Sequence, residues 1–168
     1  VEAAVESIQA QAKKVKGVDD LRKVATVSSN WSTDIGNMIA EAFDKVMAAI
    51  GLPRSNDDEK ARRRQAIEEA TKGAAAVPLR VTALAAEVIA LARVVAEKGN
   101  PNAITDAGVA GRLGLAGAEG AGLNVRINLS GLKDEAFRRE AATEVGRNVD
   151  LARRTAAEVA AVVERRMS

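Results

Sequence analysis

The stretch EKGNPNAITDAGVAGRLGLAGAEGAGLNVRIN, residues 97–128, decides how the rest of the chain folds. It opens with a helix stop, because Lys98 is followed by a Gly-Asn-Pro run. A new helix is expected to begin near Thr105, whose hydroxyl can accept hydrogen bonds from the free N–H groups of the first turn. Asp106 then falls in that turn, where the helix dipole favours a negative charge.

Glycine recurs at every third position of this expected helix, at Gly108, Gly111, Gly114, Gly117 and Gly120, and Gly122 follows. Each interior glycine costs a helix about 1 kcal/mol relative to alanine, so the run forfeits roughly 5 kcal/mol. Either another backbone or a ligand must pack closely here to offset that loss. A helix–helix contact through small residues is the ordinary explanation. A collagen triple helix is excluded, because the short triplets contain no proline.

Polar side chains accompany the glycine run and favour a pocket wall over simple packing. Asn124 and Asn128 are four residues apart, so they share one helix face. Asparagine is a poor helix former and needs hydrogen-bond partners when it is buried. On residue type alone, however, Asp106 would be an ordinary acidic residue of a helix N-terminus.

Several blocks in this region resemble the cyclodeaminase/cyclohydrolase family of folate one-carbon enzymes, which includes formiminotetrahydrofolate cyclodeaminase domains and bacterial methenyltetrahydrofolate cyclohydrolases. They are GNPNAITDAGVA and LNVRINLSGLKDEAF, supported by AFDKVMAAIGLP, AAAVPL and VVAEKGN. The resemblance runs from about Ala42 to Arg139 and fades into the last helix, which ends near residue 168. It implies an all-α fold, an antiparallel helical bundle that is dimeric, with the folate site between helices.

The first section of the chain, residues 1–46, resembles a different family. VKGVDDLRKVATVSSNWSTDIGNMIAEAFDKV is similar to the helical stretch that joins the equatorial and intermediate domains of group I chaperonins. The chaperonin GDGTT motif is absent, so a working chaperonin is excluded. The Pro- and Gly-rich loop with which the folate family begins is also absent, and Ile39 stands where that family tends to carry an acid. We therefore expect a single helical domain over 1–168, with the cyclodeaminase/cyclohydrolase resemblance in 47–168.

Composition narrows the class of protein. The 168 residues are 47% hydrophobic but only 2% aromatic, which is typical of closely packed helices. A net charge of +2 without a dense basic patch argues against nucleic acid. There is no cysteine and no histidine, so we expect no disulfide, no metal site and no cofactor. No apolar run approaches the ~20 residues of a membrane span, which predicts a cytoplasmic protein that binds no membrane.

Periodicity and capping signals predict helices joined by short turns. The expected helices are 1–16, 19–27, 34–50, 59–75, 79–98, 105–129 and 134–167. We expect a polar turn at Ser28–Thr33 around Trp31, and a boundary or kink at Val77-Pro78. The helix over 79–98 is apolar on most sides, so it should be central and buried.

The family resemblance implies hydrolysis of 5,10-methenyltetrahydrofolate to 10-formyltetrahydrofolate. The substrate carries a cationic amidinium, and without His or Cys a carboxylate is the available base or orienting group. We expect Asp106 to fill that role and Lys98 to meet the glutamate tail or the formyl oxygen. The expected substrate-binding amides are Asn100, Asn102, Asn124 and Asn128. A formiminotetrahydrofolate cyclodeaminase and a non-catalytic folate-binding or scaffold remnant stay open as alternatives.

Overall fold

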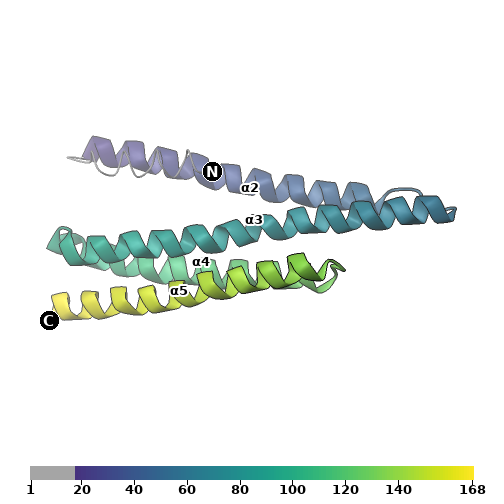
Figure 1. Cartoon of the computed structure of the whole chain (residues 1–168). Coiled ribbons are helices and arrows are strands. Elements are labelled where there is room, and N and C mark those ends of the chain that lie inside the picture. The colour runs from purple at the N-terminus through teal and green to yellow at the C-terminus, as the bar shows by residue number, and fades with distance from the viewer. Residues whose placement is uncertain (1–17) are drawn as a thin grey trace. The chain divides into compact units, whose positions relative to one another are not determined.

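A computed structural model describes residues 18–168, and it describes side chains from residue 34 on. The described elements are α2 (Val18–Ile50), α3 (Asp57–Lys98), the short 3-10 helix η1 (Pro101–Ala103), α4 (Ile104–Ser130) and α5 (Glu135–Met167), all labelled or coloured along the chain in Figure 1. No strand occurs among these residues, so the prediction of an all-α fold is confirmed. The helix predicted over residues 1–16 lies outside the described part of the chain.

The chain divides into two compact units, Val1–Lys45 and Val46–Ser168. The border falls inside α2, beside the position where the two family resemblances meet. Helix α2 is continuous from Val18 to Ile50, so the polar turn predicted at Ser28–Thr33 is wrong. That segment contains neither glycine nor proline, and Ser, Thr and Asn disfavour a helix interior only weakly.

Helix α3 is also continuous, so of the boundary or kink predicted at Val77-Pro78 the boundary is wrong, and the kink stays a prediction. Pro78 has no N–H group to donate to the carbonyl of Ala74, four residues earlier. The side-chain amide of Asn128 donates to that Ala74 carbonyl oxygen at 3.4 Å, and to the Asn124 carbonyl oxygen at 2.9 Å. A side chain of α4 thus supplies the hydrogen bond that the proline removes, and α3 can run on through it.

Local signals set both ends of α3, and its end at Lys98 follows the predicted helix stop. Asn56 caps its start by accepting from the Glu59 N–H at 2.9 Å, and the Glu59 carboxylate accepts from the Ser55 N–H at 2.7 Å. Gly99 ends the helix in an extended conformation with φ of −79°. A Cβ atom at this position would collide with the carbonyl oxygen of Val95, so the site needs glycine for space.

Small residues let α4 pack tightly against both of its neighbours. A Cβ atom added at Gly114 would lie 2.6 Å from Ile89 of α3, and one at Gly111 would lie 3.0 Å from Val159 of α5. Gly108 and Gly122 face Val163 and Val149 of α5 at 3.4 and 3.2 Å. Helix α4 therefore runs in the opposite direction to α5, and the packing explanation for the glycines is confirmed at these four positions. At Gly117 and Gly120 an added Cβ atom would meet nothing within 4 Å.

Helix α3 buries one side and exposes the other. Ile89 and Ala92 are buried in one cluster with residues of α4 and α5, whereas a second set keeps 45–49% of its surface exposed. The exposed set is Val88, Leu91, Val94 and Val95. The expectation of a helix buried on most sides is therefore wrong for its C-terminal half.

An 18-residue window of α3 reaches a mean hydropathy of 1.7, with 28% of the window buried. By length and composition alone α3 is apolar enough to cross a membrane, so the expectation that no run approaches that limit is wrong. The core helix of a protein that never enters a membrane meets the same criterion. Ile89 of α3 shares one buried cluster with Ala118 of α4 and Val159 of α5, which is the behaviour of such a core helix.

Candidate functional site

The turn between α3 and α4 gathers four of the six predicted site residues. Lys98 is the last residue of α3, Asn100 and Asn102 belong to the 3-10 turn, and Asp106 lies in the first turn of α4. The side-chain oxygen of Asn100 accepts from the Asn102 N–H at 3.0 Å, which caps η1. This end of the molecule therefore brings one carboxylate, one ammonium group and two amides to the same short segment.

The start of α4 differs from the prediction by one residue and by its cap. The helix begins at Ile104, and its N-cap residue Ala103 forms no side-chain hydrogen bond. Thr105 lies inside the first turn, so its predicted capping role is wrong. Residues Pro101–Ala103 form a 3-10 turn that leads directly into α4, so the N-cap position falls on Ala103. Thr105 lies two residues after that position, inside the helix.

All four of these side chains are exposed in the single chain. No hydrogen bond or ion pair joins Lys98 or Asp106 to another side chain in the described part of the molecule. No asparagine amide contacts the Asp106 carboxylate there. The expected pocket wall around Asp106 is therefore not closed by one chain alone.

Asn124 and Asn128 lie at the other end of α4. They follow Asp106 by 18 and 22 residues, and at a rise of 1.5 Å per residue this places them roughly 27 and 33 Å along the helix axis. Asn124 is exposed, whereas Asn128 is partly buried and gives its amide protons to the Ala74 and Asn124 carbonyls. The sequence predicts one cluster of six residues, but within a single chain these residues form two separate groups.

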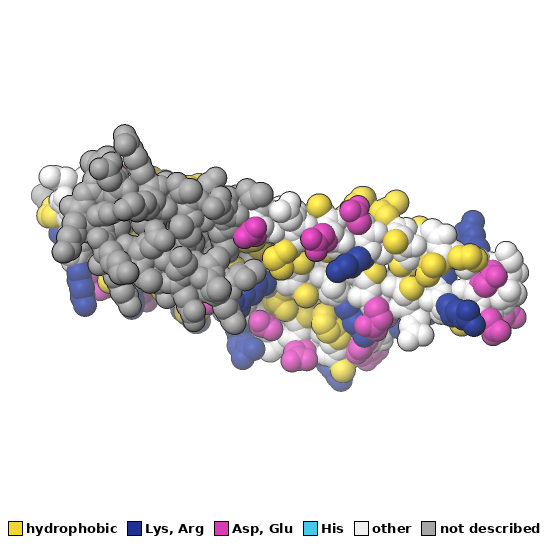
Figure 2. All heavy atoms as spheres, turned by 90° about the horizontal axis from the view of Figure 1, so that it is seen from above, with side chains coloured by type: hydrophobic (Ala, Val, Ile, Leu, Met, Phe, Trp, Pro, Cys, Tyr) yellow, Lys and Arg dark blue, Asp and Glu magenta, His cyan; other side chains and the backbone are white. Residues whose placement is uncertain are grey.

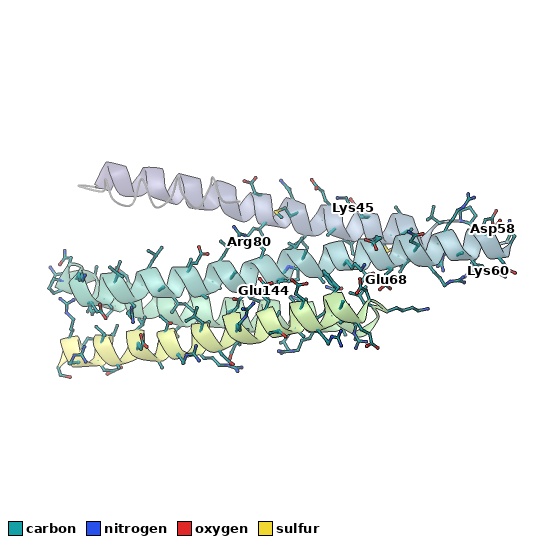
Figure 3. All side chains as sticks on the ribbon, viewed as in Figure 1. Lys45, Asp58, Lys60, Glu68, Arg80 and Glu144 are labelled. Carbon is teal, nitrogen blue, oxygen red and sulfur yellow. The ribbon has the colours of Figure 1, made fainter. Side chains whose placement is uncertain are left out.

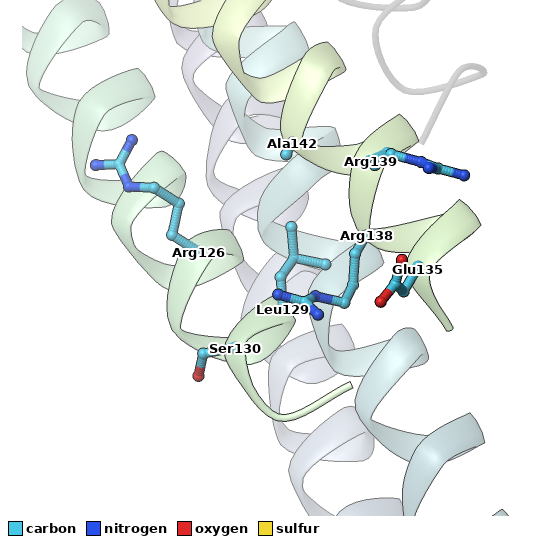
Figure 4. A pocket seen from close by; sticks show the side chains of 7 residues that line it. All are labelled: Arg126, Leu129, Ser130, Glu135, Arg138, Arg139 and Ala142. Carbon is cyan, nitrogen blue, oxygen red and sulfur yellow. The ribbon is translucent and has the colours of Figure 1, made fainter. Parts of the chain in front are cut away.

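A groove of about 590 Å³ lies at the same end of α4, between the end of that helix and the start of α5, and neither Asn124 nor Asn128 lines it. Arginine dominates its lining, which comprises Arg126, Leu129, Ser130, Glu135, Arg138, Arg139 and Ala142 (Figure 4). Sequence reasoning missed this groove, although the adjacent arginines at the start of α5 were a visible signal. Figure 4 shows Arg126 and Arg139 pointing away from each other, while Arg138 lies beside Leu129. A site for a single anion would require guanidinium groups that converge on one point, and these groups do not converge.

A second groove of about 560 Å³ adjoins the turn between α4 and α5, and it contains a structural polar cluster. Glu68, labelled in Figure 3, accepts from the Lys133 and Asp134 N–H groups at 2.7 and 2.9 Å. The Asp134 carboxylate caps α5 by accepting from the Phe137 N–H at 3.0 Å and pairs with Lys72 at 2.9 Å. The Phe137 N–H and then Lys72 hold the pKa of Asp134 below its usual value. Because each group has a partner within the chain, this cluster anchors the turn.

Elsewhere the described residues include exposed hydrophobic side chains but no group of three or more acids placed to hold a metal ion. Figure 2 shows hydrophobic side chains interspersed with acidic and basic ones on one face of the molecule. On α2, Ile39, Phe43 and Met47 are 54%, 62% and 49% exposed and follow one another at a spacing of four. Ile39 thus continues an apolar stripe of that helix at the position where an acid was expected.

Comparison with known proteins connects this architecture to a family. The family model described as formiminotransferase-cyclodeaminase matches residues 3–147. The chain is 47% identical over 136 residues to a methenyltetrahydrofolate cyclohydrolase of Methylorubrum extorquens, covering 79% of this chain and 65% of that one. It is 30% identical over 134 residues to the formimidoyltransferase-cyclodeaminase of Rattus norvegicus, covering 80% of this chain and 25% of that one. The chain thus spans less than two thirds of the length of either curated relative.

A solved structure and one short segment complete the comparison. The crystal structure of formiminotetrahydrofolate cyclodeaminase from Thermotoga maritima matches with a TM-score of 0.69 and 26% identity, covering 96% of this chain and 80% of that one. A segment of 46 residues, 27% of this chain, is 48% identical to a chloroplastic chaperonin 60 subunit of Arabidopsis thaliana, in keeping with the resemblance of residues 1–46. The family model nevertheless begins at residue 3 and so also covers most of residues 1–46. The chain belongs to the formiminotransferase-cyclodeaminase family.

Proposed function

We propose that the chain hydrolyses 5,10-methenyltetrahydrofolate to 10-formyltetrahydrofolate. The 47% identity to a methenyltetrahydrofolate cyclohydrolase over 136 residues carries this proposal. The relatives named as cyclodeaminases are less similar, at 30% identity for the rat protein and 26% for the solved structure.

The reaction adds water to the carbon that bridges two nitrogens of the substrate. The water oxygen forms a bond to that carbon, and the bond from the carbon to one ring nitrogen breaks. Of the two protons of the water, one goes to the released nitrogen and the other leaves to solvent, which removes the positive charge, while the formyl group stays on the other nitrogen. The substrate is a cation, so an exposed carboxylate can hold it and orient the attacking water. We assign this role to Asp106, which lies in the first turn of α4 with no partner among the described side chains.

The remaining predicted residues then bind the rest of the substrate. The amides of Asn102 and Asn124 are exposed and offer both donors and acceptors to the edge of a pterin ring. Asn100 and Asn128 each use part of their amide within the fold, so they contribute fewer free groups. Lys98 is exposed beside Asn100, where its ammonium group suits a carboxylate of the glutamate tail or the formyl oxygen.

A formiminotetrahydrofolate cyclodeaminase activity is the second candidate, favoured by the match to the solved cyclodeaminase over 96% of this chain. That reaction closes the same ring system and releases ammonia, so the same carboxylate and amides would serve it. A third candidate is a folate-binding or scaffold remnant without turnover, favoured by Ile39 at a usually acidic position. We further propose that the working form is a homodimer of antiparallel helical bundles. We place it in the cytoplasm, where proteins rarely contain disulfides, so a chain without cysteine is compatible with that compartment.

Stopped-flow absorbance of the methenyl group separates these candidates. We expect the chain to accelerate loss of the methenyl chromophore in the absence of formimino substrate. Ammonia release from a formimino substrate, without acceleration of methenyl hydrolysis, would favour the cyclodeaminase. Calorimetric binding of a folate without either reaction would leave the remnant, and absence of both binding and turnover would contradict all folate functions.

A further inference from the structure

The last turn of α5 lies at the same end of the bundle as the turn between α3 and α4 (Figure 1). The guanidinium group of Arg166, in that last turn, donates to the carbonyl oxygen of Ala96 at 2.5 Å. Ala96 belongs to α3 and lies two residues before Lys98 and four before Asn100. A side chain of α5 therefore reaches the backbone of α3 directly beside the candidate site.

The Ala96 carbonyl lies in the last turn of α3, where a helix leaves carbonyl groups without the N–H group that would follow four residues later. The chain leaves the helical conformation at Gly99 and Asn100, whose ψ angles are −178° and 125°. The Gly99 N–H donates to the Val95 carbonyl oxygen at 2.8 Å, and Arg166 donates to the next carbonyl along the chain. A guanidinium group suits this position, because the C-terminal end of a helix carries a partial negative charge.

The same end of α5 also packs against the start of α4. Val163 faces Gly108 of α4, where an added Cβ atom would lie 3.4 Å from the valine side chain. Val163 shares one buried cluster with Ala96 of α3 and Ile104 of α4. Apolar burial holds these helices together without a preferred direction, whereas a hydrogen bond requires a defined geometry. Arg166 adds that directional contact between α5 and the end of α3.

Within the described part of the chain, hydrogen bonds to near neighbours shape the turn over residues 99–103. The side chain of Asn100 accepts from the Asn102 N–H, and the Ala103 N–H donates to the Asn100 carbonyl oxygen, both at 3.0 Å. Such local bonds fix the shape of a turn but not its place relative to α5. That place depends on where the end of α3 is held, and the bond from Arg166 holds it.

We propose that Arg166 is a positioning residue for the proposed reaction, because it fixes the place of Asn100 and Asn102 relative to Asp106. This inference rests on the proposed function. Arg166 acts through the backbone of α3 and does not touch the substrate. A displacement of about 1 Å is enough to cost an enzyme up to about 100-fold in rate. Asp106 lies on α4, whose first turn is anchored by the buried Ile104, so loss of the bond should raise KM more than it lowers kcat.

Hydrogen exchange measured by mass spectrometry tests the contact without reference to activity. Arg165→Ala is the matched control, because Arg165 is also exposed in the last turn of α5 and forms no hydrogen bond or ion pair with the described residues. We expect the amides of Gly99 and Ala103 to exchange at least about tenfold faster in Arg166→Ala than in the wild type, and at the wild-type rate in Arg165→Ala. Equal exchange in the two variants would overturn the proposal.

Steady-state kinetics of methenyl hydrolysis, at a temperature well below unfolding of each variant, test the functional part. We expect Arg166→Ala to raise KM about tenfold while kcat stays within about threefold of the wild type, and Arg165→Ala to change neither. Arg166→Lys should recover part of the loss in KM, because an ammonium group can still donate to the Ala96 carbonyl. A bond that serves stability alone would lower the melting temperature and leave KM unchanged.

Two results distinguish failure of this inference from failure of the proposed function. If the wild type is active and Arg166→Ala keeps its KM, the positioning role is wrong while the function stands. If the wild type has no turnover, the proposed function fails and the positioning role fails with it. The exchange rates at Gly99 and Ala103 then still decide whether Arg166 holds the turn.

Discussion

Replacing Gly114 with alanine tests whether the glycines of α4 serve packing. The added Cβ atom would lie 2.6 Å from Cγ1 of Ile89, a fully buried side chain. That atom is attached to a branched Cβ, so it cannot move away without a change of rotamer. Overpacking of this kind costs about 1–3 kcal/mol, and the gain in helix propensity returns about 1 kcal/mol. We therefore expect a net loss of about 1 kcal/mol.

Gly146→Ala is the matched control for this substitution. Gly146 is an interior position of α5, and an added Cβ atom there would meet nothing within 4 Å. Its replacement should stabilise the chain by about 1 kcal/mol through helix propensity alone. Thermal unfolding followed by circular dichroism should then show melting temperatures about 4–8 °C apart, with Gly114→Ala the lower. If both variants rise together, the close contact between α4 and α3 is not the reason for the glycine.

Two further substitutions test the polar contacts that hold the helices. Asn128→Ala should destabilise the fold by about 1–3 kcal/mol in urea unfolding, because the Ala74 carbonyl loses the hydrogen-bond donor that replaces the missing N–H of Pro78. Asn124→Ala is the control and should change stability little. Equal losses for the two variants would argue against the role of Asn128. Asp134→Asn should have its full destabilising effect above about pH 4 and a smaller effect in stronger acid. The folded pKa of Asp134 is depressed below its usual 3.8, so its contribution is present above that value and lost as pH falls through the folded pKa. Unfolding curves of wild type and variant should therefore converge in acid, and a constant difference across pH would contradict the assignment.

Local signals in the sequence account for both ends of α3. Gly99 and Asn56 act within a few residues of the backbone that they terminate or cap, so their effect can be predicted without the rest of the fold. The helix breaks predicted at Ser28–Thr33 and at Pro78 do not occur, and each prediction is wrong for its own reason. The first segment lacks any strong helix breaker, and at Pro78 the missing hydrogen bond is replaced by Asn128 from another helix. The sequence around a proline does not show such a distant partner.

The candidate site shows the limit of reasoning from one segment. Residues 97–128 are close in sequence, but a straight helix separates Asp106 from Asn124 by roughly 27 Å. The resemblance supplied the family and the residue types, and the family match to residues 3–147 agrees with it. Neither could show which face of α4 is exposed, because that depends on which helix faces α3 and α5 pack against.

The rate of methenyl hydrolysis by Asp106→Asn, compared with Asp58→Asn, tests the central claim most directly. Asp58 is the matched control, because it is also an exposed carboxylate in the first turn of a helix, at the far end of α3 (Figure 3). We expect stopped-flow traces to show a loss of at least about 100-fold for Asp106→Asn and wild-type rates for Asp58→Asn. Equal rates for the two variants would contradict the assignment of Asp106 to the reaction.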